Sequence, residues 1–385
     1  MKNKSVGIVA DWLVTFAGAE KVIKEFIDIY PDSSLYSVVD FLSDNSRTQF
    51  NGKVASTSFI QSLPGSKKHY QKYLPLMPIA IEQIDVSQHD LIISSSHAVS
   101  KGIITGPDQL HISYVHSPIR YAWDLQHQYL KEAGLQRGLK GMLSKYILHK
   151  MRIWDYRTAN SVDHFVANSQ FIARRIKKFY GRDADVIYPP VNVDKFTLFE
   201  KKDDFYLTAS RMVPYKKMDL IVDAFSKMKN KKLVVIGDGP EMEKIKSKAS
   251  SNIEILGYQE DDVMIDYMQR AKAFVFASLE DFGISPLEAQ ACGTPVIAFG
   301  KGGALETVRP SGVSRPTGVF FAEQNVQSLI DAIDAFELTI DNYSPESCRD
   351  NALQFSDQRF RDEFRKYTEN KWEQFCDSKK IKYSE

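Results

Sequence analysis

The chain has 385 residues, of which 43% are hydrophobic and 26% charged, a composition typical of soluble globular proteins and a length that predicts two domains. Lys and Arg total 50 against 49 for Asp and Glu, and this balance argues against nucleic acid as a partner. The three cysteines lie far apart without Cys/His metal-ligand spacing, so we expect a reducing cytoplasm and neither disulfides nor zinc.

The first half of the chain alternates short apolar stretches with helical patterns. Asp11 interrupts the N-terminal apolar run, so we interpret residues 5–10 as a buried strand and not as a signal peptide. Further buried strands are expected at 34–39, 90–96, 111–116 and 164–169. Continuous apolar strands between helices predict a parallel sheet that is covered on both faces.

Two segments of the first half combine basic and apolar residues. Residues 135–154 have apolar side chains at helical spacing and no acidic residue, and their cations are Arg137, Lys140, Lys145, Lys150 and Arg152. Residues 66–78 form a second basic and aromatic patch. Such a helix either lies on an anionic membrane surface or is a core helix with a basic polar side. No stretch reaches the roughly 18 apolar residues that span a bilayer.

The second half repeats the strand and helix pattern after a Pro-Pro pair within residues 186–196, which we take as the domain boundary. Its strands are expected at 205–211, 232–239, 253–257, 273–278 and 294–299. We therefore expect an α/β protein with two doubly wound Rossmann-like domains, at 1–187 and 188–356. A C-terminal helix at about 357–385 carries a heavy apolar face and should pack back on the first domain.

Residues that directly follow strands are the first candidates for function, because paired doubly wound domains bind ligands in the cleft between the carboxyl ends of their strands. Four polar residues stand at such places: His116, Arg211, Asp238 and Glu280. Arg211 is followed by Lys216 and Lys217 at the start of a helix, a combination that can clamp a diphosphate. The same cations are also compatible with a solvated basic turn.

The stretch EDFGISPLE, residues 280–288, places two carboxylates on either side of a turn that enters a helix. The backbone N–H groups of Gly283, Ile284 and Ser285 are free to bind an anion there. Glu288 can accept hydrogen bonds from a ribose diol, and Glu280 can accept them from a sugar beyond the phosphates. Alternatively, Glu288 stabilises the first turn of its helix and Glu280 caps a turn.

The stretch 280–298 resembles the EX7E signature of family 4 of the retaining GT-B glycosyltransferases. The resemblance extends over nearly the whole chain, because further family motifs occur in the expected order: AGAEKV, ANSQFIARRI, VIYPPVNVDKF, SRMVPYKKMDL, IGDGPE, ILGYQED and GGALETV. It implies a GT-B fold with an interdomain cleft, in which the N-terminal domain takes the acceptor and the C-terminal domain binds the nucleotide sugar.

The resemblance also assigns roles to individual residues. Glu280 contacts the donor sugar, Glu288 holds the ribose, and Arg211 and Lys216 bind the diphosphate. The remaining expected donor-binding residues are Gly18, Tyr258, Phe282, Gly283 and Ile284.

The chain departs from the family pattern at two places. Lys217 stands where the family more often has glycine, which leaves open which lysine dominates. The N-terminal phosphate-approach loop, Ala17-Gly18-Ala19, retains one glycine where two are commoner.

His116 lies in HSPIRYAWD, a segment that also resembles a branch with bacterial polysaccharide mannosyltransferases of the O-antigen type. A histidine after a strand is often structural, but the family has one beside the donor sugar, so we assign His116 and Glu280 as catalytic. On the acceptor side the resemblance places Arg120, Tyr121, Trp123 and Asp124. A packed aromatic corner with an Arg–Asp pair is the alternative.

The resemblance implies hexose transfer with retention, without a metal or other cofactor, because Arg211, Lys216 and backbone dipoles stabilise the leaving diphosphate. We expect GDP-mannose as donor and a growing bacterial glycan, free or lipid-linked, as acceptor. The alternatives are a UDP-sugar donor and a non-catalytic nucleotide-sugar-binding scaffold subunit. We expect a cytoplasmic protein that is peripheral on the inner face of the membrane if the basic helix contacts lipid.

Overall fold

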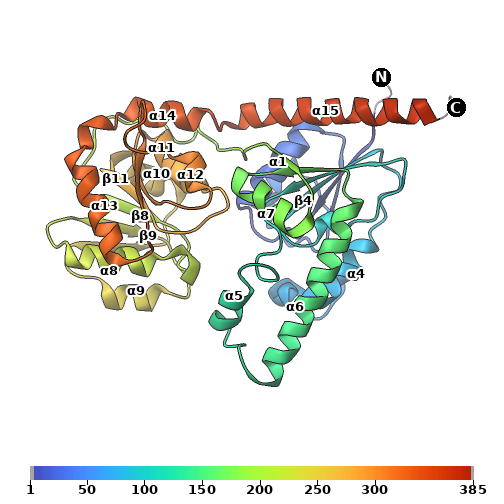
Figure 1. Cartoon of the computed structure of the whole chain (residues 1–385), viewed down its shortest axis with the longest axis horizontal. Coiled ribbons are helices and arrows are strands. Elements are labelled where there is room, and N and C mark those ends of the chain that lie inside the picture. Colours follow the sequence, from blue (N-terminus) through green and yellow to red (C-terminus); the bar gives the residue numbers. More distant parts are fainter. Residues whose placement is uncertain (1–3, 383–385) are drawn as a thin grey trace. The chain divides into compact units, whose positions relative to one another are not determined.

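The computed structural model describes residues 4–382, which form two compact units (Figure 1). Unit 1 runs to Pro189 and resumes at Phe360, and unit 2 comprises Pro190–Arg359. The boundary expected at 187/188 lies close to the first division. The long helix α15 (Asp357–Lys382) belongs to unit 1 from Phe360 on, and residues 383–385 of the expected C-terminal helix lie outside the described residues.

Unit 1 is built on a parallel sheet with the strand order β3-β2-β1-β4-β5-β6-β7. Its strands are β1 (Val6–Ala10), β2 (Ser34–Ser37), β3 (Ser56–Thr57), β4 (Leu91–Ser96), β5 (Leu110–Val115), β6 (His164–Ala167) and β7 (Ala184–Val186). The chain runs from β1 outward to β3 and then returns to pair β4 with the other side of β1. The carboxyl ends of β1 and β4 therefore flank the topological switch point, where doubly wound sheets bind ligands.

Helices cover both faces of this sheet, as its buried strands require. They are α1 (Gly18–Ile29), α2 (Asp44–Thr48), α3 (Ser66–His69), α4 (Met77–Glu82), α5 (Gln126–Glu132), α6 (Gly138–Thr158) and α7 (Gln170–Tyr180), with α15 from Phe360 on. On one face Phe26 of α1 packs against Phe360 and Phe364 of α15, both of which are fully buried. These contacts confirm that the C-terminal helix packs on the N-terminal unit.

The opposite face of the unit 1 sheet is covered by α4 and α6. Met77 and Ile81 of α4 and Leu148 and Met151 of α6 join one buried cluster with strand residues such as Ile92. The α6 helix begins at Gly138, three residues after the start of the basic segment at 135, and its buried positions lie in its second half apart from Gly141. Part of the expected apolar stripe therefore does not enter the core.

Unit 2 contains a second parallel sheet, with the strand order β10-β9-β8-β11-β12-β13. Its strands are β8 (Tyr206–Ala209), β9 (Leu233–Ile236), β10 (Ile253–Gly257), β11 (Ala273–Phe276), β12 (Val296–Phe299) and β13 (Gly318–Phe321). The chain again reverses direction across the sheet, here between β8 and β11, which are hydrogen-bonded neighbours. The residues that follow these two strands hence flank the switch point of unit 2.

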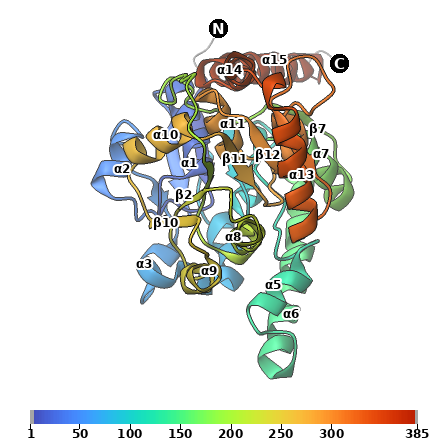
Figure 2. The same cartoon turned by 90° about the vertical axis from the view of Figure 1, so that its left-hand side faces the viewer.

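The helices of unit 2 also divide between the two faces of its sheet (Figure 2). They are α8 (Met218–Lys227), α9 (Met242–Lys248), α10 (Asp261–Arg270), α11 (Ile284–Ala291), α12 (Ala304–Thr307), α13 (Val326–Leu338) and α14 (Pro345–Leu353). Side chains of α8, α9 and α13 share one buried cluster with the strands. The two doubly wound parallel sheets confirm the expected α/β fold class.

Candidate functional site

Arg211 lies just after β8, on a backbone segment that the glycine turn after β9 holds in place. A Cβ on Gly237 would lie 1.9 Å from the carbonyl oxygen of Ser210, and a Cβ on Gly239 would lie 2.5 Å from that of Met212. Both glycines also have positive φ, at 137° and 155°. Glycine is thus required here so that the two turns can pack closely on both sides of Arg211.

The guanidinium of Arg211 is exposed and makes no hydrogen bond or ion pair with any of the residues 4–382. Its backbone is nevertheless fixed, because the Met212 N–H donates to the carbonyl oxygen of Asp238 at 2.8 Å. An arginine that is positioned at a switch point and unpaired is available to an external anion, which it can bind with forked hydrogen bonds.

Lys216 and Glu280 come together across the switch point of unit 2. Lys216 Nζ lies 2.6 Å from Glu280 Oε1, and the side chains are 20% and 14% exposed. Lys217 forms no ion pair within the described part of the chain and has a left-handed backbone, with φ at 57°. An L-residue adopts that conformation at a cost of about 1–2 kcal/mol, which gives a physical reason for the glycine that the family commonly has there.

The loop between β11 and α11 packs closely against a second pair of glycines, Gly302 and Gly303. The Gly303 N–H donates to the carbonyl oxygen of Glu280 at 2.9 Å, and a Cβ on Gly303 would lie 2.3 Å from the Cα of Phe282. Phe282 is 3% exposed and packs on Phe355, so its ring is an anchor of the loop. Gly283, with φ at 94°, then starts α11, whose first residue is Ile284.

Glu288 is buried and is the fifth residue of α11, so it lies in the second turn of the helix. The sequence-based placement in the first turn was wrong, because the helix begins already at Ile284, directly after the left-handed Gly283, and four of its residues precede Glu288. Its charge is therefore not positioned chiefly to favour the helix N-terminus. Tyr258 follows β10 and is 69% exposed.

In unit 1, His116 follows β5 and is partly buried, with its Nε2 2.8 Å from Ser95 Oγ. Burial lowers the pKa of His116 to about 3, and the positive charge of His97 acts in the same direction. His116 is therefore neutral at neutral pH, and its imidazole can exchange hydrogen bonds with hydroxyl groups without adding charge.

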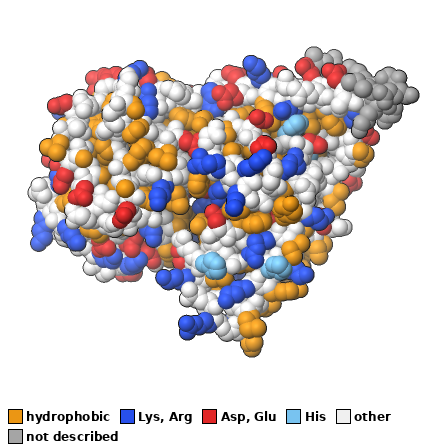
Figure 3. All heavy atoms as spheres, viewed as in Figure 1, with side chains coloured by type: hydrophobic (Ala, Val, Ile, Leu, Met, Phe, Trp, Pro, Cys, Tyr) orange, Lys and Arg blue, Asp and Glu red, His pale blue; other side chains and the backbone are white. Residues whose placement is uncertain are grey.

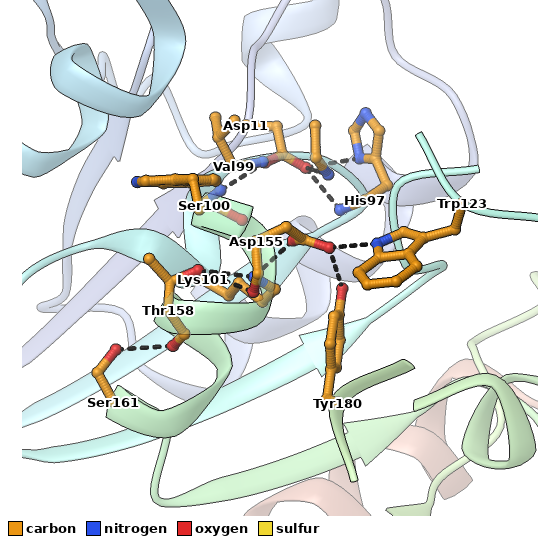
Figure 4. A network of polar contacts seen from close by, with 12 residues as sticks. Asp11, His97, Val99, Ser100, Lys101, Trp123, Asp155, Thr158, Ser161 and Tyr180 are labelled. Carbon is orange, nitrogen blue, oxygen red and sulfur yellow. Dashed lines mark hydrogen bonds and ion pairs between the residues drawn. The ribbon is translucent and has the colours of Figure 1, made fainter. Parts of the chain in front are cut away.

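Asp11, directly after β1, anchors the carboxyl edge of the unit 1 sheet (Figure 4). Its carboxylate accepts backbone N–H bonds of 2.5–3.0 Å from His97, Ala98, Val99 and Ser100. Burial alone would raise the pKa of Asp11, but the charge of His97 and these hydrogen bonds lower it well below its ordinary value. Asp11 is thus a permanent buried anion.

His97 is the side-chain partner of Asp11, with its Nδ1 2.9 Å from Asp11 Oδ2 and its side chain 30% exposed. Burial lowers the pKa of His97, but the carboxylate of Asp11 outweighs this effect and raises it. Neither Asp11 nor His97 was predicted from the sequence as a site residue. Both directly follow a buried strand, which is the same signal that singled out Arg211 and Glu280.

The four residues expected on the acceptor side have different surroundings. Arg120 lies near enough to His97 for its charge to lower the pKa of that histidine. Burial raises the pKa of the Tyr121 hydroxyl. Trp123 donates from Nε1 to Asp155 at 2.7 Å and stacks on Phe179.

Asp124 pairs with Arg175 at 2.5 Å. Trp123 thus packs in an aromatic contact, and Asp124 forms an ion pair with Arg175, a residue that the sequence did not select.

A buried polar network lies beside this edge and connects it to α6 (Figure 4). Lys101 Nζ lies 2.6 Å from Asp155 Oδ1, and both side chains are almost completely buried. Asp155 also accepts from Tyr180 and Trp123, so its charge is compensated by three donors. The network connects the segment that carries His97 to the helix α6, and it was not predicted from the sequence.

Gly18 is the first residue of α1, and the backbone of Ala17 before it is extended. Glu20 accepts a hydrogen bond from the N–H of the N-cap residue Ala17 at 3.1 Å and so satisfies one backbone donor at the start of the helix. Burial raises the pKa of Glu20.

Two further properties can be stated for residues 4–382. Among them, no group of three or more His, Cys, Asp or Glu side chains is arranged to hold a metal ion. None of the helices described is both long and apolar enough to cross a membrane.

The fold and these two sheet edges define the chain as a GT-B protein with two Rossmann-like domains. Residues 18–195 match the model of glycosyltransferase family 4, and residues 192–355 match that of glycosyl transferases group 1. The two matches together extend through both units, and the chain belongs to the family 4 glycosyltransferases.

Comparison with individual proteins agrees with this assignment. The chain is 33% identical over 178 residues to an uncharacterized glycosyltransferase of Methanocaldococcus jannaschii, covering 44% of the chain and 49% of the relative. It is 31% identical over 186 residues, 40% of the chain and 49% of the relative, to a GDP-mannose-dependent monoacylated alpha-(1-6)-phosphatidylinositol monomannoside mannosyltransferase of Corynebacterium glutamicum. The chain thus spans about half the length of these curated relatives.

Among solved structures, Anabaena HepE in complex with UDP is similar in fold, with a TM-score of 0.69. The superposition covers 95% of the chain and 100% of HepE, at 16% identity.

Proposed function

We propose that this chain is a retaining, metal-independent hexosyltransferase that uses a nucleotide diphosphate sugar. The observation that carries the proposal is the exposed Arg211, which has no side-chain partner among residues 4–382 and follows β8 at the switch point of the unit 2 sheet, in the same loop as Lys216. By the family resemblance, these two cations bind the diphosphate. Glu288 binds the ribose, and Glu280 contacts the donor sugar.

The chemistry follows from where charge develops during transfer. The bond between the anomeric carbon and the diphosphate oxygen breaks, and the leaving diphosphate gains negative charge that Arg211, Lys216 and the start of α11 would stabilise. The acceptor hydroxyl bonds to the anomeric carbon on the same face, and its proton passes to the leaving phosphate oxygen. His116, neutral because it is buried, would hydrogen-bond a sugar hydroxyl.

We propose GDP-mannose as the donor and a bacterial polysaccharide, free or lipid-linked, as the acceptor. The relative from Corynebacterium glutamicum, which is named as GDP-mannose-dependent, supports this donor. A UDP-sugar is the second candidate, because the structure of HepE contains UDP. We rank it second because the similarity to HepE extends to the fold alone.

The test is release of nucleoside diphosphate from GDP-mannose, UDP-glucose and UDP-N-acetylglucosamine in EDTA, with NMR of the anomeric configuration of any product. We expect turnover of GDP-mannose, undiminished by the chelator, and an α-linked product from the α-linked donor. Activity that needs added Mg²⁺ or Mn²⁺, or an inverted product, would contradict the mechanism. Tight binding without turnover of any donor would favour the scaffold subunit instead.

We further propose that the first half of α6 rests on an anionic membrane, at the inner face of the cytoplasmic membrane. Four apolar residues there are more than half exposed: Leu139, Met142, Leu143 and Tyr146. They are flanked by Arg137, Lys140, Lys145 and Lys150, and Figure 3 displays hydrophobic and basic side chains together over this end of unit 1. Apolar area with cations and without acids matches an anionic lipid surface.

Vesicle sedimentation tests this surface. Lys140→Glu with Lys145→Glu should release the protein from vesicles of phosphatidylcholine and phosphatidylglycerol, because each cation contributes on the order of 1 kcal/mol near such a surface. The control, Lys201→Glu with Lys229→Glu, makes the same charge change on exposed sites of unit 2 and should bind normally. Equal binding of both variants, or no binding of the unaltered protein at low salt, would refute the membrane contact.

A further inference from the structure

Two residues that the family resemblance assigns to the donor neutralise each other in this structure. Lys216 Nζ lies 2.6 Å from Glu280 Oε1, and both side chains are mostly buried. Apart from Lys216, this carboxylate oxygen has no hydrogen-bond partner among the described residues. The ion pair therefore compensates the negative charge of Glu280, which would otherwise be partly shielded from water without a partner.

The backbone on both sides of the ion pair is fixed. The carbonyl oxygen of Glu280 accepts from the Gly303 N–H at 2.9 Å, and a Cβ on Gly302 would lie 2.4 Å from the same oxygen. On the other side the Lys216 N–H donates to the carbonyl oxygen of Val213 at 3.0 Å. The pair can hence separate by rotation of its side chains, with little backbone movement.

A diphosphate that binds Lys216 must compete with Glu280 for it. A free nucleoside diphosphate offers the carboxylate nothing in exchange, and its phosphates repel Glu280. A nucleotide sugar differs, because its sugar hydroxyls can donate hydrogen bonds to Glu280 and so replace the lost partner. Opening the ion pair should thus weaken binding of the product nucleotide more than binding of the donor.

We propose that the Lys216–Glu280 pair makes unit 2 select the intact nucleotide sugar over the free nucleoside diphosphate, and so favours release of the nucleotide after transfer. This inference rests on the proposed function and names what discriminates donor from product at the same site. The pair is a specificity determinant, and both Lys216 and Glu280 are needed for this selection.

Calorimetric titration of the full-length protein with GDP, GDP-mannose, UDP and UDP-glucose tests the inference. Glu280→Gln, which keeps the size of the side chain, should tighten binding of the free diphosphate about tenfold and should not tighten binding of the nucleotide sugar. Lys216→Met should weaken both ligands. Adding Glu280→Gln to it should tighten the free diphosphate clearly less than Glu280→Gln does when Lys216 is present, because only the repulsion by Glu280 is then removed. Glu254→Gln is the control, because Glu254 pairs with Lys232 at 3.2 Å on exposed surface and carries the same charge.

Each outcome decides between the claims. If the unaltered protein binds none of the four ligands, the proposed function fails and the inference fails with it. If it binds them and Glu280→Gln leaves the affinity for the free diphosphate unchanged or weaker, the inference is overturned and the proposed function stands. Equal tightening of diphosphate binding in Glu254→Gln would show that the effect comes from net charge, and would also overturn the role proposed for the Lys216–Glu280 pair.

Discussion

The carboxyl edges of the two sheets carry polar groups of opposite character. In unit 1 the carboxylate of Asp11 is fully buried, accepts four backbone N–H bonds and pairs with His97. In unit 2 the guanidinium of Arg211 is exposed and has no partner within the described residues, and Lys216 is held by a single ion pair.

The difference indicates two tasks. A buried anion with every lone pair satisfied is an internal scaffold, and its removal should destabilise the fold. An unpaired cation on a fixed backbone does nothing for stability and is available for a ligand. The edge of unit 1 should therefore respond to mutation through folding, and the edge of unit 2 through binding.

The largest expected effect is that of Asp11→Ala. It leaves four backbone N–H groups and the His97 cation without their acceptor, so the free energy of unfolding of unit 1 should fall by about 3–5 kcal/mol. Urea titration followed by tryptophan fluorescence measures this unit selectively, because Trp12, Trp123, Trp154 and Trp372 all lie in it. Exposed Asp32→Ala is the control and should change stability by less than about 0.5 kcal/mol. Similar losses in both variants would contradict the scaffold role of Asp11.

Arg211→Ala should behave in the opposite way. Stability should be unchanged, whereas the affinity for GDP or UDP should fall at least tenfold, since a charged hydrogen bond is worth about 1.5–3 kcal/mol. Calorimetry of the variant beside Arg315→Ala, which removes the same charge near Asp350, measures the difference. Unaltered nucleotide affinity in Arg211→Ala would remove the basis of the donor site.

The two histidines of unit 1 should give stability profiles of opposite slope. His97 has a folded pKa above its unfolded value near 6.5, so its contribution is complete below that pH and is lost as the pH rises through the folded pKa. His116 has a folded pKa of about 3, so its contribution is complete above 6.5 and is lost as the pH falls.

Unfolding of His97→Gln and His116→Gln between pH 5 and 9 measures these slopes. The stability of the unaltered protein relative to His97→Gln should decrease toward high pH, and relative to His116→Gln it should decrease toward low pH. Each slope should be on the order of 1 kcal/mol per pH unit where the group titrates. Parallel profiles for the two variants would contradict the assigned environments.

The smallest effect is expected at Lys217. Glycine adopts the left-handed backbone of this residue without steric cost, so Lys217→Gly should raise the free energy of unfolding by about 0.5 kcal/mol. Lys217→Ala, which keeps the strain, should not stabilise, and neither variant should abolish nucleotide binding while Lys216 remains. Destabilisation by glycine would show that the Lys217 side chain makes contacts that matter for the fold.

Much of the fold could be predicted from the sequence, because the interior strands are continuous apolar runs. The ten expected strands all correspond to strands of the two sheets. The predictions missed β3, β7 and β13, which are the three outer strands other than β10. β3 has two residues and β7 three, and an edge strand such as β7 is only partly buried, so neither leaves a periodic signal.

The site was predictable only in part. Positions after strands and the family resemblance selected Arg211, Lys216 and Glu280, and the structure brings the last two into contact. The pairing of Asp11 with His97 depends on β1 and β4 becoming neighbours although they are far apart in the chain, which no local pattern reveals. Glu288 was placed in the first turn of its helix, because the positive φ at Gly283 that sets the start of α11 at Ile284 cannot be read from composition.

Hydrogen exchange of the full-length protein with and without GDP or UDP, in EDTA, tests the central claim most directly. Unit 2 should bind the diphosphate at its switch point without a metal, so the backbone amides of 211–217 and 283–285 should exchange more slowly when nucleotide is bound. Protection confined to unit 1, or protection at these segments that requires added Mg²⁺, would contradict the account.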